Sequence, residues 1–227
     1  MYVFVGSRYV YQCYTVLSTV VTMARGLLTL LVLLVTNAAT QGAAPVKVDV
    51  YFETLCPDSI RFFKDQLTAA VSAIEEIMTV ELTAYGFATA TPSGDGYKFE
   101  CQHGADECYG NKIVACTKKY ITSEKTFLDF TLCLMDEGSY PPINGKMCAE
   151  KMGFKWDPIK ECVDSVEGQQ LLYQEGVKQN RLSPAVDYIP WIIINDVFSR
   201  ANLDEAQVDL IGLVCNTYTG TPPNGCK

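Results

Sequence analysis

The stretch Val46-Lys-Val-Asp-Val-Tyr-Phe-Glu-Thr-Leu-Cys-Pro-Asp-Ser59 decides the fold. Up to Phe52 it is rich in β-branched and aromatic residues, which is typical of a strand. From Ile60 onward, apolar residues recur at steps of three and four, the spacing of one helical face. We therefore expect Cys56 at the point where a strand is followed by a helix.

The segments further along predict a parallel strand pair and a later return to strand structure. Residues 80–87 have strand composition, so the order strand, helix, strand gives a βαβ unit with a right-handed crossover. Residues 91–96, Thr-Pro-Ser-Gly-Asp-Gly, indicate a loop. Residues 188–195 again favour a strand, and Asn202 with Glu205 predicts the N-terminus of a last helix. This order predicts an α/β protein.

A helical insertion is expected at about residues 101–180. This stretch carries six cysteines, several short helical patterns, and proline interruptions at 140–142 and 156–158. We interpret it as a set of short helices held together by disulfides. Without repeats or low-complexity tracts, residues 45–227 are expected to form one domain.

Residues 1–44 have the composition of a signal peptide rather than of a domain. They contain no acidic residue and two arginines, and residues 27–35 are almost wholly apolar. Residues 1–22 are an upstream extension if Met23 is the true start. An apolar run of about ten residues is shorter than the roughly 20 that span a bilayer, so we expect no membrane span after cleavage.

The cysteine count and the charge restrict the compartment and the partners. Nine of the ten cysteines follow the signal region, which favours an oxidising or acidic compartment of the secretory pathway. An odd number leaves at least one thiol free or paired with another molecule. Loss of residues 1–38 moves the formal net charge from −8 to about −10, which argues against nucleic acid as a partner.

Cys56 is the candidate nucleophile. Free backbone N–H groups and the helix dipole at a helix start favour a thiolate, and Pro57 suits the first helical turn, whereas the carboxylate of Asp58 opposes the thiolate. The alternative is that Cys56 forms a disulfide with another cysteine. In a C-x-x-C pair the second cysteine resolves the mixed disulfide, and Ser59 cannot perform that step.

Other kinds of site have weaker support. Cys101, Cys108 and Cys116 surround the only histidine, His103, but their spacings do not match structural zinc sites, so we expect disulfides and no metal. No G-x-S-x-G or phosphate-binding glycine motif is present. The eight cysteines expected in disulfides are Cys101, Cys108, Cys116, Cys133, Cys148, Cys162, Cys215 and Cys226; only the pair Cys215–Cys226 is suggested, by proximity at the C-terminal end.

A sixteen-residue segment matches a known signature. Cys101, Gln102, His103, Gly104, Glu107, Cys108, Asn111 and Cys116 reproduce C-Q-H-G-x-x-E-C-x-x-N-x-x-x-x-C in full. With the strand before Cys56 and the Ile-Pro-Trp segment at 189–191, the chain resembles the gamma-interferon-inducible lysosomal thiol reductase (GILT) family over about residues 46–226.

The resemblance implies a thioredoxin-like βαβ core with a disulfide-stapled helical insertion. It also implies a thiol–disulfide oxidoreductase that reduces protein disulfides in endosomes or lysosomes and aids antigen processing. Cys56 takes the place of the attacking cysteine and Ser59 that of the resolving one. Ile189-Pro190 is then expected to be a cis peptide facing Cys56, although a plain proline at the start of a strand is the alternative.

Two hypotheses follow. In the first, Cys56 attacks disulfide-containing proteins, Ser59 donates a hydrogen bond to its thiolate, and Pro190 shapes the substrate site. An external thiol such as cysteine or glutathione then completes turnover without another cofactor. In the second, motivated by Ser59, the chain is a secreted, non-catalytic binding or immune-modulating protein. The predicted localisation is secreted or endosomal/lysosomal, through the secretory pathway, and no oligomeric state is specified.

Overall fold

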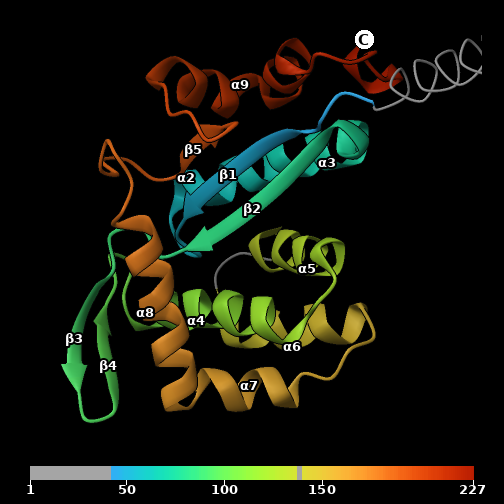
Figure 1. Cartoon of the computed structure of the whole chain (residues 1–227). Coiled ribbons are helices and arrows are strands. Elements are labelled where there is room, and N and C mark those ends of the chain that lie inside the picture. The colour runs from blue at the N-terminus through green and yellow to red at the C-terminus, as the bar shows by residue number, and fades with distance from the viewer. Residues whose placement is uncertain (1–41, 137–139) are drawn as a thin grey trace, which may run out of the picture. The chain divides into compact units, whose positions relative to one another are not determined.

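The structure is a computed structural model that describes residues 42–136 and 140–227 (Figure 1). The expected signal peptide at 1–44 lies almost entirely outside these residues. No helix in the described part of the chain combines the length and the apolar character needed to cross a bilayer.

A three-stranded sheet with the order β2-β1-β5 organises the fold. β1 (Val46–Phe52) pairs in parallel with β2 (Met78–Ala84), so Val46 lies opposite Met78. β5 (Trp191–Ile194) runs antiparallel along the other edge of β1, with Val48 opposite Ile194. The predicted parallel pair is confirmed, and β1 is the central strand.

A helical segment in four successive parts connects β1 to β2. It consists of α2 (Pro57–Phe62), a π-helical turn (Phe63–Leu67), α3 (Thr68–Ile74) and a 3₁₀ turn (Glu75–Ile77). The segment begins at Pro57, so Cys56 lies at the predicted junction of strand and helix. Proline is well placed there because its missing N–H would have no helical acceptor. We call residues 46–84 together with β5 the sheet region.

A β-hairpin replaces the loop predicted at 91–96. β3 (Thr89–Ser93) pairs with β4 (Gly96–Glu100) in a separate two-stranded sheet beside α8. Gly94 takes a φ of 58° in the turn, a conformation that glycine adopts without steric cost. Most residues of β3 and β4 are at least partly exposed, so the alternation that identifies a half-buried strand is weak here.

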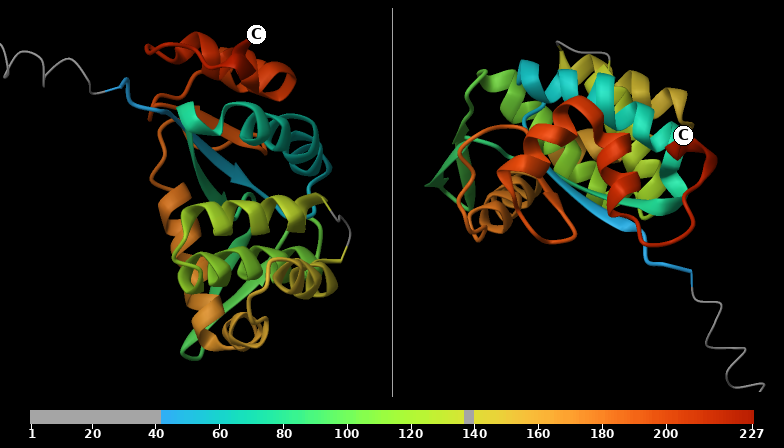
Figure 2. Two further views of the ribbon diagram at one scale, coloured as in Figure 1. Left: turned by 90° about the vertical axis from the view of Figure 1, so that its right-hand side faces the viewer. Right: turned by 90° about the horizontal axis from the view of Figure 1, so that it is seen from above.

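Five helices form the segment between the hairpin and β5, which we call the helical insertion (residues 101–179). They are α4 (Ala105–Tyr120), α5 (Glu124–Asp136), α6 (Pro141–Lys151), α7 (Asp157–Val163) and α8 (Val166–Gln179). Figure 1 and Figure 2 show α4 surrounded by its neighbours, and it contacts α5, α6, α7 and α8. Gly145 of α6 allows the ring of Trp156 to approach closely.

Side chains of β1 alternate between two apolar clusters. Val48 and Val50 belong to the main core, which also includes Phe130 of α5 and Leu210 of the last helix. Tyr51 points to a smaller cluster on the other face, with Trp191, Ile193, Leu203 and Cys56. Trp191 stacks on Phe198 with ring centroids 3.8 Å apart. Because both faces of the sheet are covered, nearly every residue of β1 is buried.

The last helix, α9 (Arg200–Thr217), begins earlier than predicted. Its N-cap is Ser199, whose hydroxyl accepts the N–H of Asn202 at 3.0 Å. The prediction that Asn202 caps this helix is therefore wrong, because Asn202 lies in the first turn and donates the hydrogen bond. A short 3₁₀ turn, Asn224–Cys226, ends the chain.

Four disulfides join eight of the cysteines. Cys101–Cys108, Cys116–Cys162 and Cys133–Cys148 lie in the helical insertion, and Cys215–Cys226 joins α9 to the C-terminal turn. Cys56 is the free cysteine of the described residues.

Candidate active site

Cys56 occupies the N-cap of α2, where β1 has ended and the helix begins. Its backbone is extended (φ −66°, ψ 122°), Pro57 follows at the first helical position, and its carbonyl accepts the N–H of Ile60 at 2.9 Å. Only 8% of Cys56 is exposed, and it packs in the cluster of Tyr51 and Trp191. The junction of strand and helix expected from the sequence is thus where the free thiol lies.

The thiol of Cys56 faces a segment that is remote in sequence. Its Sγ donates a hydrogen bond to the carbonyl of Ile189 at 3.9 Å, and the Ile189–Pro190 peptide is cis. The sheet makes this contact because β5, which directly follows Pro190, lies beside β1. A thiol and a backbone acceptor are therefore held together at the carboxyl end of β1.

Ser59 has a different partner from the one hypothesised. It is fully buried, and its Oγ accepts the backbone N–H of Glu53 at 3.4 Å. The Cys56 thiol donates its hydrogen bond to the Ile189 carbonyl. Ser59 forms no hydrogen bond with this thiol. The hydroxyl therefore joins the first turn of α2 to the loop that precedes it.

Asp58 is held by two groups at the surface of the site. Tyr188 Oη donates a hydrogen bond to it at 2.6 Å, and Arg61 forms an ion pair at 2.7 Å. The hydrogen bond from Tyr188 and the charge of Arg61 hold the pKa of Asp58 below its usual value. Burial, together with Asp58, raises the pKa of Tyr188 to about 12. Sequence reasoning did not select Tyr188, because it lies 130 residues from Asp58.

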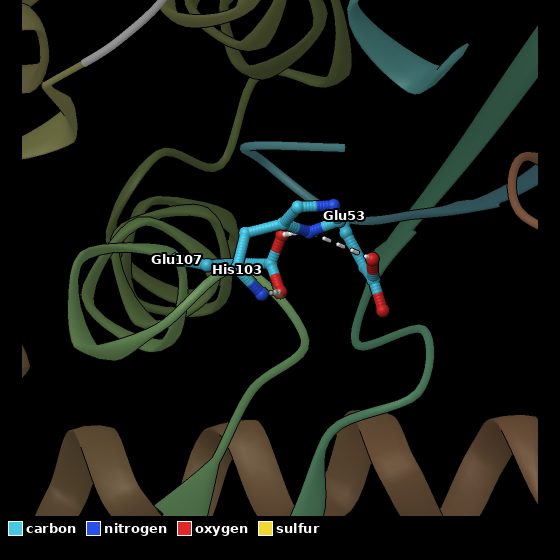
Figure 3. A group of neighbouring side chains, drawn as sticks. All are labelled: Glu53, His103 and Glu107. Atoms are coloured by element: carbon cyan, nitrogen blue, oxygen red, sulfur yellow. Dashed lines mark hydrogen bonds and ion pairs between the residues drawn. The ribbon is translucent and has the colours of Figure 1, made fainter. Parts of the chain in front are cut away.

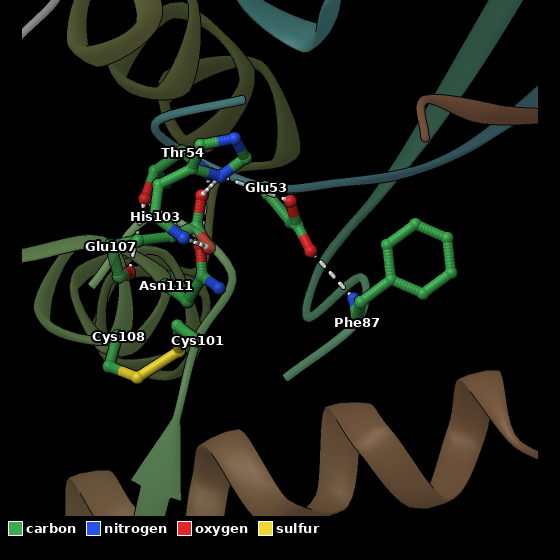
Figure 4. Close-up of a disulfide and its surroundings, with 8 residues drawn as sticks. All are labelled: Glu53, Thr54, Phe87, Cys101, His103, Glu107, Cys108 and Asn111. Carbon is green, nitrogen blue, oxygen red and sulfur yellow. Dashed lines mark hydrogen bonds and ion pairs between the residues drawn. A yellow bond between two sulfur atoms is a disulfide. The ribbon is translucent and has the colours of Figure 1, made fainter. Parts of the chain in front are cut away.

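The signature segment contacts the loop before Cys56 through Asn111 (Figure 4). The Oδ1 atom of Asn111 accepts the N–H of Thr54 at 3.1 Å and its hydroxyl at 3.0 Å. The Thr54 hydroxyl also lies 3.2 Å from the carbonyl of Glu107. A Cβ on Gly110 would lie 2.3 Å from Thr54 Oγ1, so glycine permits this close approach. The first turns of α4 thus fix the loop that ends at Cys56.

The other signature residues lie at the start of α4. Gly104 is the N-cap with a φ of 87°, and Gln102 is exposed in the preceding turn. His103 Nδ1 is 2.5 Å from Glu107 Oε2 and 3.4 Å from Glu53 Oε2 (Figure 3). Burial raises the pKa of Glu53 to about 7. Glu53 was not expected to take part in this site, because nothing in its local sequence marks it.

Comparison with known proteins assigns the chain to the same family as the signature residues do. The family model described as gamma interferon inducible lysosomal thiol reductase (GILT) matches residues 47–152. GILT-like protein 1 of Drosophila melanogaster is 34% identical over 84% of this chain and 82% of its own length. The chain belongs to the GILT family. The gamma-interferon-inducible lysosomal thiol reductase of Carassius auratus is 35% identical over 82% of this GILT chain and 73% of its own length.

Solved structures show the fold of this GILT chain. BdbD from Bacillus subtilis superposes with a TM-score of 0.52 at 15% identity, covering 72% of this chain and 88% of its own. The reduced disulfide bond oxidoreductase DsbG from Mycobacterium tuberculosis gives 0.52 at 14% identity, covering 79% and 81%. The predicted thioredoxin-like α/β fold is confirmed. By family and fold, this GILT protein is placed among the thiol–disulfide oxidoreductases.

Proposed function

We propose that this GILT protein reduces protein disulfides through Cys56 alone and depends on an external thiol for turnover. The observation that carries the proposal is the free thiol of Cys56 at the N-terminus of α2, against the Ile189 carbonyl. Backbone N–H groups at a helix start stabilise a developing thiolate. The backbone before Pro190 lies where a substrate segment next to the sulfur would meet it.

The proposed reaction has three steps, each a thiol–disulfide exchange. The Cys56 thiolate attacks one sulfur of a substrate disulfide, forming a mixed disulfide and releasing the other sulfur as a thiol. A small external thiol, such as cysteine or glutathione, attacks the Cys56 sulfur and releases the second substrate thiol. A second external thiol then attacks the disulfide between Cys56 and the first small thiol. This restores the Cys56 thiol and releases the two small thiols as one disulfide. Two electrons pass from two small thiols to the substrate.

Ser59 defines how this proposal differs from a C-x-x-C enzyme. A hydroxyl cannot attack the mixed disulfide, so the covalent complex persists until an external thiol arrives. The buried hydrogen bond of Ser59 to the Glu53 amide supports a structural role for this residue. We also propose that the protein acts in the secretory pathway, in an endolysosomal or extracellular compartment, in line with its four disulfides.

The experiment compares wild type with Cys56→Ser and Ser59→Cys in mildly acidic buffer. With an added small thiol, wild type is expected to reduce a disulfide-linked protein substrate, and Cys56→Ser to give only the rate of the thiol alone. Without added thiol, wild type should accumulate a mixed disulfide, visible in the intact mass. Ser59→Cys should release the substrate and lose two hydrogens itself.

Two results would contradict the proposal. Equal rates for wild type and Cys56→Ser in the presence of thiol would remove Cys56 as the nucleophile. Failure of Cys56 in native protein to react with an alkylating reagent would favour the non-catalytic binding hypothesis. Alkylation of unfolded Cys56 serves as the control, because it shows that the thiol is present and unmodified.

A further inference from the structure

Two buried carboxylates and one imidazole converge where α4 begins, beside the loop before Cys56 (Figure 3). One ligating atom each from Glu53, His103 and Glu107 lie within 4.8 Å of one another. Both glutamates are fully buried, whereas the side chain of His103 is 31% exposed. The group is therefore enclosed by protein on the carboxylate side and can be reached from solvent past the imidazole.

Structural roles account for every oxygen of this group except one. Glu107 Oε1 accepts the N–H of His103 at 3.1 Å and its Oε2 pairs with His103 Nδ1, which stabilises the first turn of α4. Glu53 Oε1 accepts the N–H of Phe87 at 2.6 Å. Glu53 Oε2 is buried and has no hydrogen-bond partner among the described residues. Such an atom costs free energy unless a ligand satisfies it.

The charge of the group is also unbalanced. No lysine or arginine of the described part of the chain forms an ion pair with Glu53 or Glu107, so one imidazole faces two carboxylates. A cation between the three side chains would supply the missing positive charge.

We propose that Glu53, His103 and Glu107 bind one divalent transition-metal ion, with Zn²⁺ as the ion that fits best. One imidazole with two carboxylates suits Zn²⁺, whereas Ca²⁺ and Mg²⁺ prefer oxygen ligands throughout. In a tetrahedral zinc site with bonds of about 2.1 Å, neighbouring ligand atoms are about 3.4 Å apart. The distance from Glu53 Oε2 to His103 Nδ1 is 3.4 Å.

Binding requires the ligand atoms to move, because the three lie within 4.8 Å of one another rather than at equal separations of about 3.4 Å. The 2.5 Å separation of His103 Nδ1 and Glu107 Oε2 is that of a hydrogen bond, so the ion takes the place of its proton and the two atoms separate by about 1 Å. The partly exposed imidazole can make this movement. Three protein ligands leave one position for water on the exposed side. No cysteine takes part, so this site differs from the cysteine zinc site that the spacings exclude.

The test measures Zn²⁺ binding by calorimetry in the Cys56→Ser background, which removes the free thiol as a competing ligand. With the four disulfides intact, binding of one Zn²⁺ per chain is expected. Adding Glu53→Gln should weaken binding at least about 10-fold, since even outer-shell changes cost 10- to 100-fold. The control is Glu175→Gln on α8, which removes a partly buried carboxylate that lies 3.8 Å from Lys118 and has one buried oxygen without a hydrogen-bond partner among the described residues. It should leave binding unchanged.

Three outcomes would overturn the site. They are the absence of stoichiometric binding, unchanged binding in Glu53→Gln, and equal weakening by Glu175→Gln. If circular dichroism shows that Glu53→Gln does not fold, His103→Gln replaces it, because this side chain is partly exposed. Its retention of wild-type Zn²⁺ affinity would equally refute the proposal. Visible absorption of bound Co²⁺, without a thiolate charge-transfer band, should confirm a nitrogen and oxygen ligand set.

Discussion

The sheet region and the helical insertion use cysteine in opposite ways. The sheet region holds the single unpaired thiol of the described residues, and the insertion holds three of the four disulfides. Strand β1 is hydrogen-bonded to β2 on one side and to β5 on the other, and it buries side chains on both faces. Helices as short as the seven residues of α7 are marginal without support. The sheet region contains no disulfide, so its one cysteine stays free for chemistry.

The sharpest test of this comparison is to remove the Cys116–Cys162 disulfide, which closes a loop of 46 residues. The double variant Cys116→Ala/Cys162→Ala should lose about 4 kcal/mol of unfolding free energy, because the unfolded chain gains conformational entropy. Cys56→Ser should lose less, because it opens no covalent loop and the serine hydroxyl can still donate to the Ile189 carbonyl. Urea unfolding measures both. A loss for Cys56→Ser as large as that for the pair would break the comparison.

A second test uses the shorter loop between α5 and α6. Cys133→Ala/Cys148→Ala opens a loop with a separation of 15 residues and should cost about 3 kcal/mol. Because neither cysteine belongs to the Cys56 cluster, the alkylation rate of Cys56 in the folded variant should equal that of wild type. A changed rate would show that the helical insertion affects the reactivity of Cys56, which would contradict the separation of the two regions.

A third test concerns the contact between the two regions. Thr54→Val removes the hydroxyl that binds Asn111 and the Glu107 carbonyl, and should cost about 1–3 kcal/mol. Thr117→Val is the control, since the Thr117 hydroxyl is buried without a hydrogen-bond partner among the described residues. Its replacement should be neutral or slightly stabilising. Equal losses in urea unfolding would show that cavity or shape effects, rather than the hydrogen bonds, dominate at both positions.

The smallest expected effect concerns Asp58 and Tyr188 at the edge of the site. Because its pKa is lowered by folding, Asp58 stabilises the protein above its unfolded-state pKa of about 3.9 and loses this effect as the pH falls through the lower folded value. Tyr188→Phe should therefore lower the melting temperature slightly at neutral pH and by less in strong acid. A difference that grows on acidification would have the wrong sign.

Much of the sheet region was predictable because its signals are local. The apolar run at 46–52, the helical period after it, and the free cysteine between them all lie in one continuous stretch. The hairpin at 89–100 was missed because its side chains are mostly exposed, which removes the alternation that marks a strand. The N-cap of α9 was misplaced because Ser199 and Asn202 are both good capping residues, and the backbone conformation decides between them.

The candidate site was predictable only in part. Cys56 and Pro190 carry recognisable patterns, and the signature marks His103, Glu107 and Asn111. The residues that contact them carry no such pattern. Glu53 lies 50 positions before His103, and Tyr188 lies 130 positions after Asp58. Such contacts depend on how β1, α4 and β5 are brought together, which no short segment of the sequence specifies.

The packing of the two tryptophans gives each region its own optical signal. Trp156 is buried against Gly145 in the helical insertion, and Trp191 lies in the sheet region, stacked on Phe198 in the cluster that contains Cys56. The sequence has no third tryptophan. Intrinsic fluorescence of Trp156→Phe therefore reports the surroundings of the thiol, and that of Trp191→Phe reports the disulfide-linked helices. Stopped-flow emission from these two variants can time the unfolding of each region without any attached dye.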